Sequence, residues 1–155
     1  MRSRKVLKLL LILGLLLALG MMFKSRIKML FNKIYIKMTK YGDLLPYIEA
    51  QAKHESAGFA SVVYKSQNNM FGMKHPTNRP SVGVKGMAAS DGGFYQKYSS
   101  DFESLQDLFL WMDYTKFPTT VKNSDEYAEQ LKARGYFTAG IAEYRTALKN
   151  WINKS

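Results

Sequence analysis

The sequence contains no cysteine. Disulfide bonds, thiol nucleophiles and thiolate metal sites are therefore excluded, whichever compartment the protein occupies. Histidine is scarce as well, because only His54 and His75 are present. The His54–Glu55 pair is not followed by a second histidine at helical spacing, so the zinc-protease motif is missing. We expect neither a metal site nor a cofactor.

Acidic residues are missing from the N-terminal quarter of the chain. Residues 1–40 contain no aspartate or glutamate but hold ten of the 23 lysines and arginines. Residues 41–155 therefore hold 13 basic and all 12 acidic residues, so their net charge is only +1. A nucleic-acid-binding domain carries its positive charge on the folded part. We expect no nucleic-acid partner.

A long apolar run dominates the N-terminal region. It extends over fifteen residues from Leu9 to Phe23, and over eighteen if it is counted from Val6. At about 1.5 Å per residue, eighteen helical residues span about 27 Å, close to the thickness of a bilayer core. Residues 1–23 are either a signal peptide, cleaved at the small residues Ala18 and Gly20, or an uncleaved signal anchor. Both predict an exported or membrane-anchored protein whose remaining chain lies on the periplasmic or cell-wall side.

Residues 24–40 are predicted to form a basic amphipathic linker. Apolar residues recur there at helical spacing between lysines and arginines, namely Phe23, Ile27, Leu30, Ile34 and Met38. Such a helix can lie on an anionic membrane surface. The alternative is a solvated tether that packs loosely on the domain. The membrane is thus an expected partner of the N-terminal region.

Residues 41–155 predict a single mainly α-helical domain. Asp43 as cap and Pro46 in the first turn predict a helix that stops near Gly58. Ser100 and Glu103 form a capping box that opens a second, strongly apolar helix. Two further amphipathic helices follow, over residues 124–135 and 141–151. Residues 75–94, rich in glycine and proline, predict a loop or at most a small β-hairpin.

Glu55 occupies an unusual position on the first of these helices. Ile48, Ala52 and Glu55 are spaced i, i+4 and i+7, so they share one face, and the first two make it the buried face. Burial and the negative end of the helix dipole both raise the pKa of a carboxyl group. A carboxyl that stays protonated near neutral pH suits a general acid. The alternative is an outward-facing Glu55 paired with Lys53 or Lys65.

Four segments of the sequence resemble the glucosaminidase family in the expected order. They are AQAKHES, NNMFGMK, YQKYSSDFESLQD and YAEQLKARGYFT, and together they span about residues 44 to 152. The family comprises endo-β-N-acetylglucosaminidase-like peptidoglycan hydrolases of the lysozyme-like superfamily. The matching positions are Gln51, Glu55, Ser56, Asn68, Asn69, Phe71, Gly72, Lys74, Tyr98, Ser104, Tyr127, Leu131, Gly135, Tyr136 and Thr138.

The resemblance implies a lysozyme-like helical domain with Glu55 as catalytic acid. It also places Asn69, Phe71 and Tyr144 among the substrate-binding residues. Many relatives carry a second carboxylate on the hairpin, and in this chain the one acid in that segment is Asp91. Asp91 precedes Gly92-Gly93, however, so it is also a good turn residue.

Aromatic and amide side chains supply the other candidates for binding sugar. Tyr98 and Tyr136 can stack on sugar rings or hold an N-acetyl group, with core packing as the alternative. For Asn69 the alternative is a capping role in a turn. The second catalytic group is therefore one of three: Asp91, the N-acetyl oxygen of the substrate, or a water held by a tyrosine.

The resemblance implies a peptidoglycan N-acetylglucosaminidase that cleaves glycan strands. Two alternative functions are compatible with the same fold. One is a non-catalytic glycan-binding protein of a cell wall or virion, and the other is a lytic transglycosylase.

Overall fold

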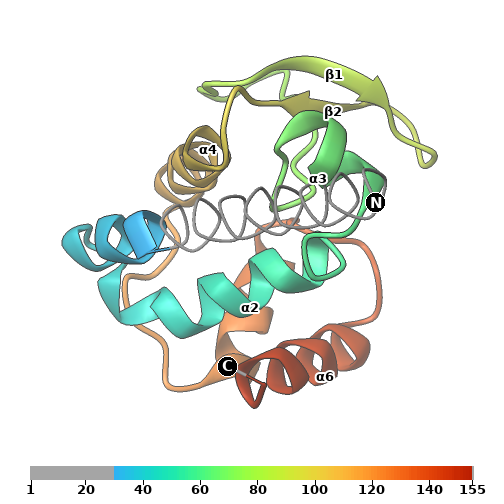
Figure 1. Cartoon of the computed structure of the whole chain (residues 1–155). Helices are drawn as coiled ribbons and strands as arrows, with labels where there is room; N and C mark the ends of the chain where they lie inside the picture. Colours follow the sequence, from blue (N-terminus) through green and yellow to red (C-terminus); the bar gives the residue numbers. More distant parts are fainter. Residues whose placement is uncertain (1–29, 155) are drawn as a thin grey trace, which may run out of the picture.

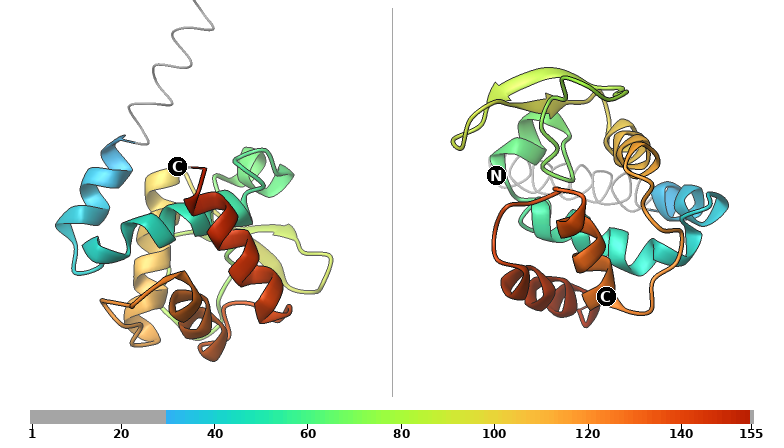
Figure 2. Two further views of the ribbon diagram at one scale, coloured as in Figure 1. Left: turned by 90° about the horizontal axis from the view of Figure 1, so that it is seen from below. Right: turned by 180° about the vertical axis from the view of Figure 1, so that it is seen from behind.

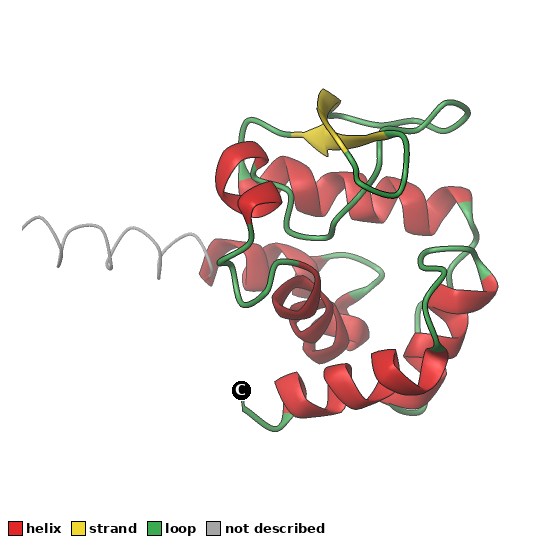
Figure 3. Cartoon of the chain, turned by 90° about the vertical axis from the view of Figure 1, so that its right-hand side faces the viewer, coloured by secondary structure: helices red, strands yellow, loops and turns green. Residues whose placement is uncertain are grey.

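Most of the described chain is helical, and one small pair of strands lies at its edge (Figure 3). The computed structural model describes residues 30–154. A helix over residues 30–38 is followed by η1 (Gly42–Leu44), α2 (Leu45–Glu55), α3 (Val62–Gln67), β1 (Val84–Ala88), β2 (Phe94–Lys97), α4 (Asp101–Tyr114), α5 (Ser124–Ala133) and α6 (Ile141–Ile152). The prediction of a mainly α-helical domain with a small hairpin is confirmed.

The predicted signal peptide or anchor, residues 1–23, lies outside the described residues. Between residues 30 and 154, no helix is both long enough and apolar enough to cross a bilayer.

The start of α2 differs from the prediction. Asp43 does not cap the helix, because it lies inside η1 and Leu44 occupies the N-cap position without a side-chain hydrogen bond. The 3-10 turn leads directly into the helix, and the backbone N–H of Leu45 bonds to the carbonyl of Gly42. This bond takes up one of the donors that a side-chain cap would otherwise satisfy. Pro46 does lie in the first turn, as predicted.

Helices α2, α5 and α6 enclose one part of the core, and α4 closes it from the other side (Figures 1 and 2). The apolar stripe of each helix faces inward, and all four contribute fully buried residues, among them Ile48, Leu108, Leu131 and Leu148. Ser100 caps α4 by accepting a hydrogen bond from the backbone N–H of Glu103. The carboxylate of Glu103 in turn accepts from the N–H of Ser99, so its predicted capping role is confirmed.

The hairpin of β1 and β2 lies over α3 in Figure 1. The two strands are antiparallel, with Val84 opposite Lys97 and Ala88 opposite Phe94. The pairing is irregular between Lys85 and Ala88. The glycine- and proline-rich segment thus contains a loop, the first strand and the hairpin turn.

The helix over residues 30–38 packs on the domain through a face that the sequence analysis did not select. Ile36 is 3% exposed and belongs to the core. The ring of Tyr35 contacts those of Phe102 and Phe109, with centroid distances of 4.7 and 6.0 Å. The predicted apolar stripe, of which the structure describes Leu30, Ile34 and Met38, faces outward instead.

Candidate active site

Glu55 is the last residue of α2, and two backbone hydrogen bonds end the helix directly after it. The N–H of Gly58 bonds to the carbonyl of Lys53 at 2.7 Å, and the N–H of Ala57 to that of His54 at 3.2 Å. This pairing is a Schellman motif, with Ala57 and Gly58 both at positive φ. Gly58 is therefore part of the helix stop, as predicted. The motif fixes the last turn of α2, from which the Glu55 side chain projects.

The Glu55 carboxyl is partly buried and hydrogen-bonded. Its Oε1 accepts a 2.7 Å hydrogen bond from the hydroxyl of Tyr144 in α6. Burial raises the pKa of Glu55 to about 7, while the hydrogen bond from Tyr144 acts in the opposite direction. A carboxyl with this pKa holds its proton about half of the time at neutral pH, so it can both donate and accept one.

Aromatic neighbours hold Tyr144 in place. Its ring stacks on Phe137 with centroids 4.0 Å apart and an interplanar angle of 7°. The ring of His54 is perpendicular to that of Tyr144, with centroids 4.9 Å apart and an interplanar angle of 90°. With two sides of its ring in contact, Tyr144 is held with its hydroxyl toward Glu55.

Gly72 supplies the backbone that faces the other carboxylate oxygen. It has a φ of +60°, and a Cβ added there would lie 3.2 Å from Oε2 of Glu55. Glycine is therefore favoured at this position for two reasons, the backbone conformation and the close approach. The sequence analysis placed Gly72 in the family pattern, and the structure shows that the group it approaches is the carboxyl of Glu55.

Three further polar side chains belong to the same region of the core, namely Tyr136, Tyr127 and Gln51. The Tyr136 hydroxyl donates to the carbonyl of Phe71, and its ring meets that of Trp111 edge-on at 5.0 Å. Burial raises the pKa of Tyr136 well above its usual value, and the charge of Glu55 adds to this effect. On α5, the Tyr127 hydroxyl donates to Oε1 of the buried Gln51 at 2.6 Å.

The pair of Gln51 and Tyr127 received no site role in the sequence analysis. The available signal was spacing, since Gln51 precedes Glu55 by four residues and therefore shares its helix face. The side chain of Gln51 also lies close enough to the Tyr136 hydroxyl to lower the pKa of that tyrosine, against the larger effect of burial.

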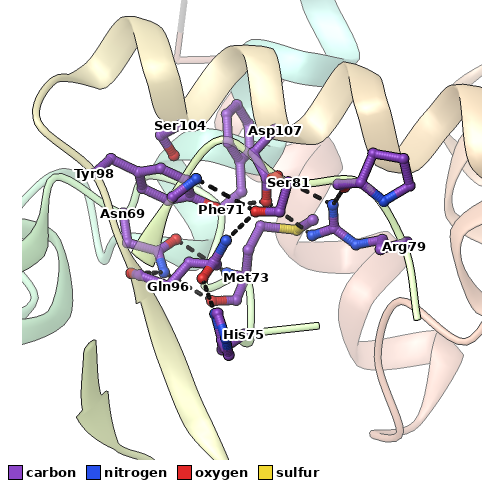
Figure 4. A network of polar contacts seen from close by, with 12 residues as sticks. Asn69, Phe71, Met73, His75, Arg79, Ser81, Gln96, Tyr98, Ser104 and Asp107 are labelled. Atoms are coloured by element: carbon purple, nitrogen blue, oxygen red, sulfur yellow. Dashed lines mark hydrogen bonds and ion pairs between the residues drawn. The ribbon is translucent and has the colours of Figure 1, made fainter. Parts of the chain in front are cut away.

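A buried polar network fixes the segment that contains Gly72 (Figure 4). The Asn69 amide donates to the carbonyls of Met73 and Gln96, both at 2.9 Å, and accepts from the N–H of Met73. The Ser104 hydroxyl accepts from the N–H of Met70 at 3.0 Å. These bonds tie residues 69–73 to the hairpin and to α4, so they set the position of the backbone opposite Glu55.

An ion pair inside the same network joins the loop after Lys74 to α4. Both terminal nitrogens of Arg79 contact the Asp107 carboxylate, at 3.0 and 2.8 Å, and the Tyr98 hydroxyl donates to it at 2.7 Å. Burial raises the pKa of Asp107, but the bonds from Arg79 and Tyr98 outweigh it and hold the pKa below its usual value. Asp107 is therefore a charged anchor in the core.

Comparisons with known proteins identify the family and a similar fold. The family model Glucosaminidase, described as mannosyl-glycoprotein endo-beta-N-acetylglucosaminidase, matches residues 32–155. The chain belongs to the glucosaminidase family. Its fold is similar to that of the catalytic domain of the autolysin Auto from Listeria monocytogenes, with 26% sequence identity and a TM-score of 0.52. That match covers 80% of this chain and 78% of the other. No curated protein matches the chain.

Within this glucosaminidase domain, the predicted site residues separate into two groups. Tyr136 and Tyr144 lie around Glu55. Asn69, Phe71 and Tyr98 are buried, and the polar groups of Asn69 and Tyr98 are engaged with the protein itself. Binding of sugar by any of the five stays a prediction. The observed contacts of Asn69 and Tyr98 are with other protein groups, so these two residues hold the backbone around the site in position.

Asp91 lies on the exposed turn of the hairpin. Its Oδ1 forms an ion pair with Nζ of Lys74 at 2.6 Å, and the same ammonium group donates to the carbonyl of Gly92. The hydrogen bond from Lys74 lowers the pKa of Asp91, which weakens it as a base. A turn role for Asp91 is observed, and its catalytic role stays a prediction. Among residues 30–154, no group of three or more potential metal ligands gathers.

Proposed function

We propose that this protein is an endo-β-N-acetylglucosaminidase that cleaves the glycan strands of peptidoglycan, with Glu55 as the general acid. The observation that supports this most directly is the pKa of about 7 for a partly buried carboxyl hydrogen-bonded to Tyr144. Membership of the glucosaminidase family and the likeness to an autolysin catalytic domain supply the substrate class.

Cleavage of a glycosidic bond requires a proton on the leaving oxygen and stabilisation of an oxocarbenium-like centre at C1. In the proposed reaction, Glu55 donates its proton to the glycosidic oxygen while the bond from that oxygen to C1 breaks. The resulting carboxylate is stabilised by the hydrogen bond from Tyr144. It then accepts a proton from the water that completes hydrolysis, which returns Glu55 to its initial state.

We assign the second role to the N-acetyl oxygen of the substrate, which attacks C1 as the leaving oxygen departs. Substrate assistance of this kind is a recognised alternative to the use of two carboxylates. The pKa of Glu55 responds to burial and to Tyr144, and among residues 30–154 no second carboxylate contributes to it. The ion pair of Asp91 with Lys74 disfavours Asp91 as the base. A water held by Tyr136 or Tyr144 is the competing assignment.

The proposal also assigns a role to each segment of the chain. Residues 1–23 act as signal anchor or signal peptide, residues 24–40 as linker, and residues 41–155 as the lysozyme-like catalytic domain outside the cytoplasm. The apolar run from Leu9 to Phe23 supports the first assignment. Because the family match begins at residue 32, we extend the catalytic unit to include the helix over residues 30–38.

The test is digestion of purified peptidoglycan by the full-length, detergent-solubilised protein, followed by mass analysis of the fragments. A reducing N-acetylglucosamine end supports the proposal, whereas an anhydromuramic end identifies a lytic transglycosylase. Binding without cleavage identifies a non-catalytic glycan-binding protein.

The variant Glu55→Gln tests the assignment of the acid. It keeps the shape of the side chain but cannot donate a proton in the same way, so we expect turnover to fall by about 10²-fold or more. Glu49→Gln is the matched control, because Glu49 is a partly buried glutamate of the same helix, paired with Lys33. Unchanged turnover in Glu55→Gln, with the fold intact, would show that another residue is the acid.

A further inference from the structure

The helix over residues 30–38 has an apolar face that the domain does not cover. Leu30, Phe31, Ile34 and Met38 are 57%, 67%, 47% and 81% exposed. Three of them are spaced four residues apart, so they form one stripe along the helix. Ile36, which anchors the helix to the core, lies on a different face. We call the four exposed residues the apolar stripe.

The apolar stripe continues into a groove between this helix and the start of α4. The groove has a volume of about 530 Å³, and its lining is mostly apolar. Phe31, Ile34 and Met38 line one side, and Phe102, itself 38% exposed, lines the other. Asp101 is the one acidic residue of the lining, and it accepts a hydrogen bond from Tyr64. Both views in Figure 2 show this helix at the outer edge of the molecule, where a large partner can reach it.

Basic residues flank the apolar stripe. Lys33 and Lys37 each precede one of its members by one position and are exposed, as is Lys40 just after the helix. Lys33 forms an ion pair with Glu49 at 2.9 Å, and Lys40 with Asp113 at 2.7 Å. The ammonium side chains of both pairs are at least half exposed, so the pairs are weak in water and these lysines can still attract an anionic surface. An apolar face bordered by lysines is the pattern of a helix that lies in a membrane interface.

We propose that the apolar stripe and Phe102 dock on an anionic lipid bilayer and orient the catalytic domain on it. The apolar run of the sequence ends at Phe23, seven residues before Leu30. At about 3.5 Å per residue, even an extended connection keeps Leu30 within about 25 Å of that run. If the run is embedded, the apolar stripe is held close to the bilayer. Lysines on its flank then favour anionic headgroups.

This inference differs from anchoring by residues 1–23, because it concerns a second contact made by the folded domain. It also does not depend on catalysis. Loss of activity in the glucosaminidase assay would leave it untouched, and failure of docking would leave the assignment of Glu55 untouched.

The absence of cysteine provides a direct test. Ile34→Cys in the full-length chain introduces a single thiol for an environment-sensitive fluorophore, and Lys122→Cys, on an exposed loop, is the matched control. Both proteins are reconstituted into vesicles of phosphatidylcholine and phosphatidylglycerol that contain a lipid with a nitroxide quencher on its acyl chain. We expect blue-shifted emission and several-fold stronger quenching at position 34 than at position 122. The difference should shrink in vesicles of phosphatidylcholine alone or at high salt.

Two other occupants of the apolar stripe give different results. A blue-shifted label at position 34 that the lipid quencher does not reach would mean that the N-terminal region of the chain covers the stripe. If the label is blue-shifted and unquenched, and the shift depends on the protein-to-lipid ratio, a second copy of the protein covers the stripe. Equal quenching at both positions would mean that the stripe faces water. Each of these three results overturns the proposal.

A second measurement separates docking from an effect of the label. With the label kept at position 34, Phe31→Ser combined with Met38→Ser should reduce quenching several-fold. Val62→Ser combined with Val84→Ser removes two exposed apolar side chains elsewhere on the surface and should leave it unchanged. All four positions are exposed, so the substitutions spare the core. Equal effects of the two pairs would contradict the proposal.

Discussion

The carboxyl of Glu55 and the hydroxyl of Tyr144, 89 residues apart in the chain, form a hydrogen bond of 2.7 Å. The bond joins the end of α2 to α6, two helices packed against one another. It opposes the effect of burial on the pKa of Glu55. The protonation of the proposed acid thus depends on how these two helices meet.

The pH dependence of cleavage should follow the pKa of Glu55. A general acid is active while protonated, so kcat/KM should fall about tenfold per pH unit above about pH 7. In Tyr144→Phe the carboxylate loses a hydrogen bond, the pKa of Glu55 rises further, and the alkaline limb should move to higher pH. Tyr64→Phe is the control, because the Tyr64 hydroxyl bonds to Asp101 and not to Glu55, so the alkaline limb of the pH profile should stay in place. A limb that moves to lower pH in Tyr144→Phe would contradict the role of this bond.

The stability of the domain should depend on pH through the same group. The pKa of Glu55 is raised from 4.5 to about 7 in the folded state. The folded state therefore binds its proton more tightly, which adds stability below pH 4.5 that is lost as pH rises to about 7. Relative to the parent, Glu55→Gln should gain about 3 kcal/mol in free energy of unfolding at pH 8 and nothing at pH 4. Urea titrations at the two pH values measure this, and an equal difference at both would contradict it.

Gly72→Ala should impair both folding and activity. The new Cβ would occupy a positive-φ conformation and lie 3.2 Å from Oε2 of Glu55. The backbone conformation alone costs about 1–2 kcal/mol, and the contact should displace the carboxyl and lower kcat. Gly93→Ala has the same conformational cost at φ +75° but meets no atom within 4 Å. Equal activity in the two variants would show that the contact with Glu55 is unimportant.

Arg79→Ala should strongly destabilise the domain. It leaves the buried Asp107 carboxylate with the Tyr98 hydroxyl but without its ion-pair partner. Breaking one side of a buried ion pair typically costs about 3–5 kcal/mol. Arg145→Ala removes a partner of the exposed Glu129 and should cost about 1 kcal/mol or less. Thermal unfolding of the two variants provides the comparison, and similar losses would show that the buried pair contributes little.

Local patterns in the sequence predicted α2, α4, α5 and α6, because each carries an apolar stripe with a start or stop signal, whereas the short helix α3 was not predicted. The capping interaction of Ser100 and Glu103, the stop at Gly58 and the final helix all follow from residues close together in the chain. Asp43 failed as a cap because a 3-10 turn precedes α2 and Asp43 lies within it. For the helix over residues 30–38, the sequence analysis left open whether the apolar stripe faces a membrane or packs on the domain, and the structure turns Leu30, Ile34 and Met38 away from the domain. Periodicity identifies an apolar stripe, but it does not say which side the rest of the domain covers.

The sequence by itself determined that a glutamate ends an amphipathic helix and that the chain resembles the glucosaminidases. It named Tyr136 and Tyr144 as site residues through that resemblance, but it could not supply the contacts that surround the glutamate. Tyr144, Gly72 and Tyr136 come from three distant segments, and only the packing of α2 against α6 and of residues 69–73 against α4 and the hairpin brings them together. Burial and hydrogen bonding, which set the pKa of Glu55, are properties of that packing. For this reason the chemistry of the site was decided by the tertiary structure.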